Sequence, residues 1–462
     1  MAFIPARSLR NCHPLLQLQK NARRCMSSST SSKEEVMGVW IFHRHGDRTP
    51  GRALVADSYI EKESSFWRTK IPPIDRTHYD LLSKKFPSKT DPNNNGGKFL
   101  DADSGKEPYG FLTWKGMQQL YEIGQQISQR YDIKDGKSFE DHWHIQAFST
   151  NYLRTVKSVQ CLLDGMFSSP SQHESQYEHR NPESYNKSSR DCDVEIIVRD
   201  PKEETLNAFD TSPILMKGLV KDIIETPNFI NHDTKAASLA ARLCNYIPAL
   251  IKLRSPYGGP SGINWIHAVD HFVCRDSHEI PLTAFSNFEN NPNEEQTLQA
   301  MKHATIAHLA SRFRFWYQSP QLLAAMVGPA LSEVNRQMNE CINAESSTKK
   351  AFNIYSCHDV TILALLYGIG AEHLAAPNEL KSVGVIDSTN EKRLRYWPGY
   401  ATTLTMELIR VETKGKKDMF VINFVLDGQN IRPMVAIRKG QDTMHLSDFN
   451  ELMHRINEVY LH

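Results

Sequence analysis

The sequence lacks the long apolar runs, the charge imbalance and the repeats that mark specialised classes of protein. No apolar run in the 462 residues approaches the ~20 needed to span a bilayer. Basic and acidic side chains number 54 and 53, so a net charge of +1 gives no whole-chain attraction to nucleic acid, and we expect no nucleic-acid partner. No segment repeats at a fixed period. With 40% hydrophobic residues, the chain is instead long enough to bury a large core.

Cysteine is scarce, and its spacing does not indicate a disulfide framework. Two of the eight cysteines fall within the first 33 residues, and the other six are widely spaced: Cys161, Cys192, Cys244, Cys274, Cys341 and Cys357. We expect small buried residues that a reducing compartment keeps as thiols, although six cysteines could form disulfides in a secreted chain.

The most informative stretch is the octapeptide His-Arg-His-Gly-Asp-Arg-Thr-Pro at residues 43–50, which follows an apolar run at residues 36–42. The run predicts a buried strand, and Gly46 and Pro50 predict a tight loop at its carboxyl end. Ligands of open α/β sheets bind at that edge. The polar residues of this loop are therefore candidates for a binding site.

Arg44 and Arg48 would direct two forked, permanently charged donors at a spot beside His45, an arrangement that suits a phosphate dianion. Nearby cations lower the pKa of an imidazole, so His45 would accept protons poorly and still be a nucleophile toward phosphorus. The alternative is that the arginines are surface cations and His45 is an ordinary loop histidine. The full string after a strand favours the functional interpretation.

Two further stretches place polar residues directly after a strand. Residues 351–357 predict a strand that ends at His358 and Asp359, before an apolar helical stretch. Residues 145–150 predict another strand, and Arg154 opens an amphipathic helix just beyond it. Each feature is common alone, but three in this order indicate one site at the carboxyl edge of a sheet.

The segment from Arg44 to Pro50 resembles the signature of the histidine acid phosphatases, the second branch of the histidine phosphatase superfamily. The downstream His358-Asp359 pair and Arg154 resemble two further elements of that family. Leu-Thr-x-x-Gly at residues 112–116 resembles a helix start of the family, with Thr113 as the N-cap and a packing role. Residues 149–163 and 404–408 resemble, in particular, the lysophosphatidic acid phosphatases of that family.

The resemblance implies a fold and a role for each residue. The fold is α/β, a mixed central sheet flanked by helices with a phosphoglycerate-mutase-like core and an inserted, mainly helical cap. His45 attacks phosphorus and becomes phosphohistidine, and Asp359 protonates the leaving oxygen. The resemblance also implies four residues that hold the phosphate oxygens, without metal or cofactor: Arg44, Arg48, Arg154 and His358. Asp47 is expected to have a structural role in the loop.

The cap is expected largely within residues 168–350 of a phosphatase domain that spans residues 34–462. Helical segments are predicted at residues 235–253 and 294–314. Residues 400–410 and 419–426 alternate in polarity and predict a hairpin.

A second constellation competes as a zinc site. Five residues have spacings compatible with one helix face and include zinc-binding side chains: His267, Asp270, His271, Cys274 and His278. The resemblance opposes this interpretation, because a segment of the family with recurring Asp and His before a Pro binds no metal.

The first 33 residues are rich in arginine and serine and contain no acidic residue. This composition is typical of a mitochondrial transit peptide, and the lack of a continuous apolar core argues against a secretory signal. A disordered cytosolic tail is the alternative. We expect mitochondrial import.

The sequence leaves three functions open. The first is a metal-independent phosphomonoesterase acting on lysophosphatidate or another small monoester. The second keeps the fold and changes the reaction, as in a mutase, a phytase or an inositol-phosphate phosphatase. The third is a catalytically inactive phosphate-binding protein, which the presence of every expected phosphate-contacting residue disfavours. Oligomeric state is not predicted.

Overall fold

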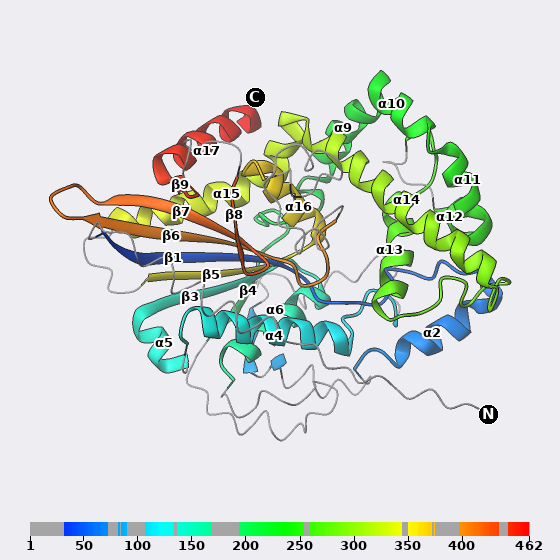
Figure 1. Cartoon of the computed structure of the whole chain (residues 1–462), viewed down its shortest axis with the longest axis horizontal. Coiled ribbons are helices and arrows are strands. Elements are labelled where there is room, and N and C mark those ends of the chain that lie inside the picture. Colours follow the sequence, from blue (N-terminus) through cyan, green and yellow to red (C-terminus); the bar gives the residue numbers. More distant parts are fainter. Residues whose placement is uncertain are drawn as a thin grey trace, which may run out of the picture.

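The computed structural model describes residues 32–72, 82–83, 85–89, 107–133, 136–168, 194–253, 259–343, 350–371, 374, 397–433 and 442–461. A nine-stranded sheet crosses these residues in the order β2-β4-β3-β5-β1-β6-β7-β8, with β9 paired to β7 (Figure 1). Its strands are β1 (Ser32–Arg44), β2 (Ser88–Lys89), β3 (Trp143–Ser149), β4 (Ile196–Val198), β5 (Lys350–Cys357), β6 (Thr403–Thr413), β7 (Met419–Leu426), β8 (Gln429–Ile431) and β9 (Met444–His445).

The sheet is mixed, and its parallel half brings the polar segments together. Strands β2, β4, β3, β5 and β1 are parallel, whereas β6 to β9 are antiparallel to their neighbours. Arg44 at the end of β1 lies opposite Cys357 at the end of β5, and Ser149 at the end of β3 lies opposite Ser356. The carboxyl ends of three strands therefore meet at one edge, and the residues that follow them share that edge.

Helices cover both faces of the sheet (Figure 1). One face is covered by α4 (Trp114–Arg130), α5 (Gly136–His142) and α6 (Leu153–Met166), whose apolar sides pack with strand residues in a continuous core. The other face is covered by α15 (Pro320–Asn343), α16 (Asp359–Gly368) and α17 (Leu446–Leu461). Thr113 caps α4 by accepting a hydrogen bond from the Gly116 amide, as the sequence predicts.

The remaining helices form the cap beyond the carboxyl edge (Figure 1). They are α8 (Ala208–Thr211), α9 (Pro213–Ile224), α10 (Pro227–Thr234), α11 (Ala237–Tyr246), α12 (Ala249–Lys252), α13 (Trp265–Ser277) and α14 (Pro292–Tyr317). Helix α2 (Ile60–Arg68), preceded by a single 3₁₀ turn at Asp57–Tyr59, follows the loop after β1. The cap shares one buried cluster with α15, α16 and the sheet.

The observed boundaries differ from the expected ones in two places. Strand β4 and helix α15 lie within residues 168–350, yet β4 pairs with β3 and α15 packs against β1 and β5, so neither belongs to the cap. The helix expected over residues 235–253 is two helices, because Pro248 lacks the amide hydrogen that a continuous helix needs. The predicted hairpin is confirmed as β6 and β7.

Other sequence-based expectations concern single residues and the N-terminus. Cys161, Cys274 and Cys357 are buried free thiols, and Cys244 and Cys341 are free and half-buried, while Cys192 lies outside the described residues. None of the described helices is long and apolar enough to cross a membrane. The expected transit peptide, residues 1–33, lies almost entirely outside the described residues.

Helices α4 and α6 cross in close contact at two glycines. A Cβ at Gly124 would overlap the carbonyl oxygen of Leu162, and a Cβ at Gly165 would overlap that of Tyr121. Backbone atoms cannot yield as a side chain can. The crossing therefore requires glycine at both positions.

We predict that Gly124→Ala lowers the free energy of unfolding by about 1–3 kcal/mol, as is typical when a methyl group is forced into a packed interior. Gly218→Ala in α9 is the matched control, since a Cβ there meets no atom within 4 Å. Removing a helical glycine should stabilise the protein by roughly 0.4–1 kcal/mol. Urea unfolding of both variants measures the difference, and equal effects would contradict the packing argument.

Candidate active site

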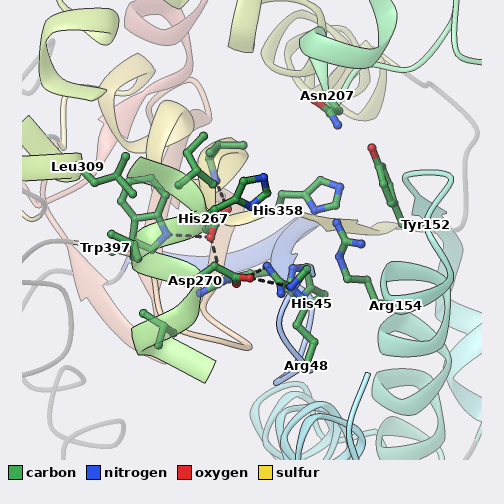
Figure 2. Close-up of a pocket in the computed structure, with 17 residues that line it drawn as sticks. His45, Arg48, Tyr152, Arg154, Asn207, His267, Asp270, Leu309, His358 and Trp397 are labelled. Atoms are coloured by element: carbon green, nitrogen blue, oxygen red, sulfur yellow. Dashed lines mark hydrogen bonds and ion pairs between the residues drawn. The ribbon is translucent and has the colours of Figure 1, made fainter. Parts of the chain in front are cut away.

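A pocket of about 220 Å³ opens at the carboxyl edge of the sheet, beneath the cap. Every catalytic or phosphate-binding residue expected from the sequence lines it: Arg44, His45, Arg48, Arg154, His358 and Asp359. Figure 2 shows His45 and His358 near the centre, with Arg154 and Tyr152 on one side and Asp270, His267 and Trp397 on the other. The structure thus brings together all six residues, which lie up to 315 positions apart in the chain.

His45 is buried in the loop after β1, and its ring orientation is fixed by a backbone contact. Nδ1 lies 2.8 Å from the carbonyl oxygen of Gly46. Because a carbonyl oxygen only accepts, this hydrogen bond places the proton on Nδ1 and leaves the lone pair on Nε2. Burial lowers the pKa of His45 well below its usual range, and the charges of Arg154, Arg44 and Arg48 lower it further. The imidazole is therefore neutral, with one nitrogen available to attack.

Arg44 and Arg48 each have contacts at both terminal nitrogens, Nη1 and Nη2, of the guanidinium. Arg44 donates from Nη1 to the carbonyl oxygen of Pro398 at 2.7 Å, and its Nη2 lies 2.9 Å from Oδ2 of Asp359. Arg48 donates from Nη1 to its neighbour Thr49 at 2.9 Å, and its Nη2 lies 2.7 Å from an oxygen of Asp270.

The Nε atoms of Arg44 and Arg48 are buried and make no hydrogen bond to the described residues. A buried cationic donor without an acceptor is costly, so these two donors at the pocket favour a bound anion. The Arg44 guanidinium also lies 4.3 Å from the centre of the Tyr400 ring, which restrains it further. The two fixed guanidiniums line the same pocket as His45 and are suited to bind an anion there.

Arg154 lies near the start of α6, as expected, and Tyr152 holds it in place. The Arg154 guanidinium lies 4.5 Å from the centre of the Tyr152 ring, and the same ring meets His358 edge-on. The Tyr152 hydroxyl donates to Asp210 in the cap at 3.0 Å. A chain of contacts from α8 thus orients the third arginine and one of the two histidines.

His358 is the N-cap residue of α16, and Asp359 is the first residue of that helix. Thr150 Oγ1 lies 3.1 Å from Nε2 of His358 and fixes its ring. Burial lowers the pKa of His358, and the charge of Arg154 adds to this effect. Burial alone would raise the pKa of Asp359, but the charge of Arg44 and a hydrogen bond from Trp397 Nε1 outweigh it and lower that pKa.

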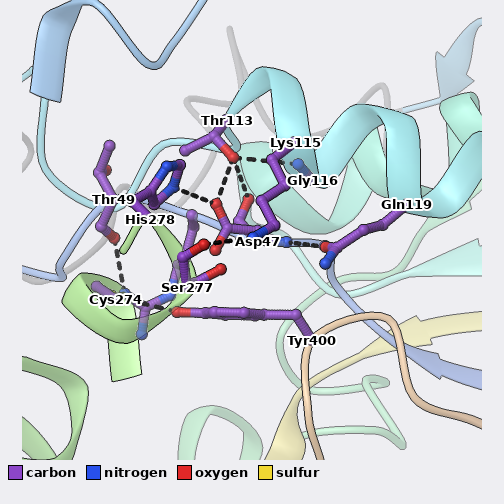
Figure 3. Close-up of polar contacts among 12 residues, drawn as sticks. Asp47, Thr49, Thr113, Lys115, Gly116, Gln119, Cys274, Ser277, His278 and Tyr400 are labelled. Carbon is purple, nitrogen blue, oxygen red and sulfur yellow. Dashed lines mark hydrogen bonds and ion pairs between the residues drawn. The ribbon is translucent and has the colours of Figure 1, made fainter. Parts of the chain in front are cut away.

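The motif loop rests on α4 through Asp47, which is fully buried (Figure 3). Its Oδ2 accepts a hydrogen bond from Thr113 Oγ1 at 2.5 Å and lies 2.6 Å from Nε2 of His278. Its amide donates to the side chain of Gln119 at 2.8 Å. A Cβ at Gly46 would overlap the backbone of Gly116, so loop and helix are in direct contact. These contacts support the structural role expected for Asp47.

The competing zinc constellation does not converge on one point. Asp270 pairs with Arg48, His271 contacts Arg275, and His278 contacts Asp47, so these three side chains have different partners. Within the described ranges, no group of three or more His, Cys, Asp or Glu side chains is arranged to hold a metal ion. Asp270 and His278 instead join this part of the cap to the loop after β1.

Four residues of the site were missed by sequence reasoning or assigned to another role: Tyr152, Asp270, Trp397 and Tyr400. Tyr152 lies two positions before Arg154, and its proximity was an available signal. Asp270 had been grouped with the zinc candidates. Trp397 lines the pocket, and the Tyr400 ring contacts Arg44 and His45. Only the fold brings these two residues to the site, because they lie more than 340 positions after the motif loop.

Similarity to known proteins points to the same family as the sequence motifs. A family model described as histidine phosphatase superfamily (branch 2) matches residues 35–212 and 272–426. The mouse lysophosphatidic acid phosphatase type 6 is 23% identical over 400 residues, which cover 84% of this chain and 78% of that protein. The human lysosomal acid phosphatase is 22% identical over 330 residues, or 71% of this chain and 61% of that protein.

Solved structures resemble the chain in fold. The apo form of Hafnia alvei phytase has a TM-score of 0.51 at 12% sequence identity, with 94% of this chain and 99% of that chain covered. A Bifidobacterium longum multiple inositol polyphosphate phosphatase, in complex with inositol hexasulfate, has a TM-score of 0.52 at 12% identity, covering 94% and 95%. At such low identity the likeness concerns the fold alone, and it agrees with the mixed sheet and helical cap expected from the sequence.

Proposed function

The chain belongs to branch 2 of the histidine phosphatase superfamily and is a phosphate monoester hydrolase of the acid phosphatase type, and we propose that it cleaves monoesters of apolar alcohols through a phosphohistidine at His45. Lysophosphatidate is the substrate class that fits best. The observation that carries the mechanism is a neutral, backbone-oriented imidazole among three fixed guanidiniums.

Phosphoryl transfer requires positioning and positive charge more than covalent assistance, because its transition state spreads negative charge over the equatorial oxygens. Arg44, Arg48 and Arg154 supply that charge from within the protein. His45 Nε2 attacks in line, and the phosphorus–oxygen ester bond breaks as the nitrogen–phosphorus bond forms. Water then hydrolyses the phosphohistidine. His358 holds a phosphate oxygen, since a bound anion favours the protonated form of its imidazole.

Asp359 is the proton donor in this proposal, although its pKa is lowered in the structure. The largest charge responsible is that of Arg44, which lies 2.9 Å from the carboxylate. A phosphate dianion would compete for Arg44 and place negative charge beside Asp359, and both effects raise the pKa of a carboxyl. Substrate binding thereby favours the protonated acid, which protonates the leaving oxygen and afterwards accepts a proton from the attacking water.

The pocket wall favours an apolar leaving group over a polyanion. Beyond the phosphate-binding residues, the lining includes a largely aliphatic set: Ile266, Val269, Val273, Leu309, Val360 and Trp397. Ile266 is 44% exposed, so this apolar wall continues to the surface of the cap. Among the described residues, the lining contains no lysine, and its only arginines are the three assigned to one phosphate. A substrate with many phosphates would lack cationic partners here.

The other functions on this scaffold have less support. The phytase-like neighbours share the fold, but an inositol polyphosphate fits the apolar wall poorly. A mutase must return the phosphoryl group to an alcohol, so release of inorganic phosphate distinguishes a hydrolase from it. A catalytically inactive binding protein would not need a proton donor, and Asp359 stands beside the site.

We predict that Asp359→Ala slows hydrolysis of alkyl phosphates by roughly 10²–10⁴, as is typical when proton transfer is lost, because an alkoxide is a poor leaving group. An activated aryl phosphate leaves without a proton and should lose less. If water attack also needs Asp359, a burst of phenol should precede slow turnover, with phosphohistidine accumulating on His45. Stopped-flow release of phenol and mass spectrometry measure both.

His45→Ala is the control and should abolish the burst and the turnover. If Asp359→Ala slows alkyl and aryl esters equally and traps no intermediate, Asp359 only supports its neighbour His358, and another group donates the proton.

The apolar wall predicts a dependence on chain length. Ile266→Ser should raise KM for a long-chain lysophosphatidate by roughly fivefold, about 1 kcal/mol of lost apolar burial, and change KM for glycerol 3-phosphate little. Ile251→Ser is the matched control, because Ile251 is 62% exposed on α12 and does not line the pocket. Equal changes for both esters, or an equal effect of the control, would remove the lipid proposal.

We also propose that the leader directs the enzyme to mitochondria, on the composition of residues 1–33. A fusion of these residues to a reporter should accumulate in mitochondria, since the segment is cationic and free of acidic residues. A diffuse cytosolic reporter would contradict the localisation and leave the catalytic proposal unaffected.

A further inference from the structure

Helix α13 of the cap contacts the motif loop through one polar face. Asp270, Cys274, Ser277 and His278 follow helical spacing, and each has a partner in the site or beside it. Cys274 lies 3.2 Å from the Tyr400 hydroxyl, and the Ser277 carbonyl accepts a hydrogen bond from Lys115 of α4 (Figure 3). The cap is thus joined to the catalytic loop at several points, and Asp270 is the point nearest to the phosphate site.

Asp270 makes two short contacts with the loop. Its Oδ1 lies 2.7 Å from Nη2 of Arg48, and its Oδ2 accepts a hydrogen bond from the Gly51 amide at 2.7 Å. The side chains of Asp270 and Arg48 are only 10% and 15% exposed. With Nη1 held by the Thr49 carbonyl, the Arg48 guanidinium has little freedom to rotate.

A carboxylate that lines a phosphate pocket requires an explanation, because it repels the anion. Burial would raise the pKa of Asp270, but Arg48 and the Gly51 amide outweigh it and lower that pKa, so the group is ionised. Its repulsion must be offset by another effect. The fixed direction of Arg48 is the effect that the contacts provide, since a misplaced charge stabilises a transition state far less well.

We propose that Asp270 is a positioning residue that acts through Arg48. It holds the guanidinium where its free Nε–H and remaining Nη–H groups meet the equatorial oxygens during transfer to His45. The assignment rests on the proposed phosphatase function, and it makes a residue of the cap part of the phosphate-binding apparatus.

A double-mutant cycle tests the proposal, because a residue that acts only through Arg48 has nothing to contribute once Arg48 is absent. Asp270→Ala should lower kcat/KM for an aryl phosphate by roughly 10–100-fold. Arg48→Ala should lower it by roughly 10²–10³-fold. The double variant should fall within about threefold of Arg48→Ala. Losses that multiply would overturn the proposal and indicate that Asp270 acts through Gly51 alone.

Asp270→Asn separates the hydrogen bond that holds Arg48 from the negative charge of Asp270. It also provides a second variant if Asp270→Ala does not fold. The single amide oxygen keeps an acceptor for Arg48 but turns the NH2 group toward the Gly51 amide, so this variant should retain more kcat than Asp270→Ala if the contact with Arg48 is the one that matters. If the two are equal, hydrogen bonding to Arg48 is not the role of Asp270. Asp276→Ala is the matched control on α13, because Asp276 also pairs with a cation, Lys302, but is 59% exposed. It should match the wild type, and a comparable loss there would also contradict the proposal.

The same double-mutant cycle can be measured without turnover, by using calorimetry to compare the vanadate affinity of the variants. If the wild type releases no phosphate from any monoester, the proposed function fails, and the vanadate cycle still decides whether Asp270 acts through Arg48. Equal vanadate affinity in wild type and Asp270→Ala, together with unchanged kcat, would overturn the positioning role.

Discussion

The site depends on the parallel pairing of β1 with β5, in which Arg44 lies opposite Cys357. His45 follows Arg44, and His358 and Asp359 follow Cys357. This register therefore places His45 beside the other two residues. A shift of one residue would turn the side chains of one strand to the opposite face. The surrounding helices maintain this pairing by burying both faces of the sheet, and the close crossing of α4 and α6 supports the face on which the motif loop rests.

Two carboxylates offset part of the positive charge at this edge. Arg44 pairs with Asp359, and Arg48 pairs with Asp270, while burial and the arginine charges keep the imidazoles neutral. Both carboxylates also accept a backbone amide, Asp270 from Gly51 and Asp359 from Val360. We propose that only Asp359 exchanges a proton, because its side chain is 22% exposed at the pocket, against 10% for Asp270. In this proposal, substrate selection depends on the apolar wall, most of which the cap provides.

The sequence predicted the site better than it predicted the cap. Each expected site residue lies at the end of a strand whose sequence pattern is recognisable, or shortly after it. Because the carboxyl ends of parallel strands share one edge of the sheet, these residues come together there: Arg44, His45, Arg48, Arg154, His358 and Asp359. The partners that orient them could not be predicted, since Asp270 and Trp397 reach the pocket only through tertiary packing. Spacing alone suggested zinc for the α13 residues, because helical periodicity shows which side chains share a face but not what that face contacts. Strand β4, which lies within the range expected to be largely cap, could not be predicted either, because it is only three residues long.

The central claim is that His45 is a neutral nucleophile with its proton on Nδ1. Nitrogen-15 NMR of histidine-labelled protein tests it most directly, with the His45 signals assigned from His45→Ala. The account predicts an Nδ1-protonated ring that stays neutral from about pH 7.5 to about pH 5, whereas an ordinary histidine, with a pKa of about 6.5, becomes charged over that range. An Nε2-protonated ring, or titration near the ordinary pKa, would contradict the account.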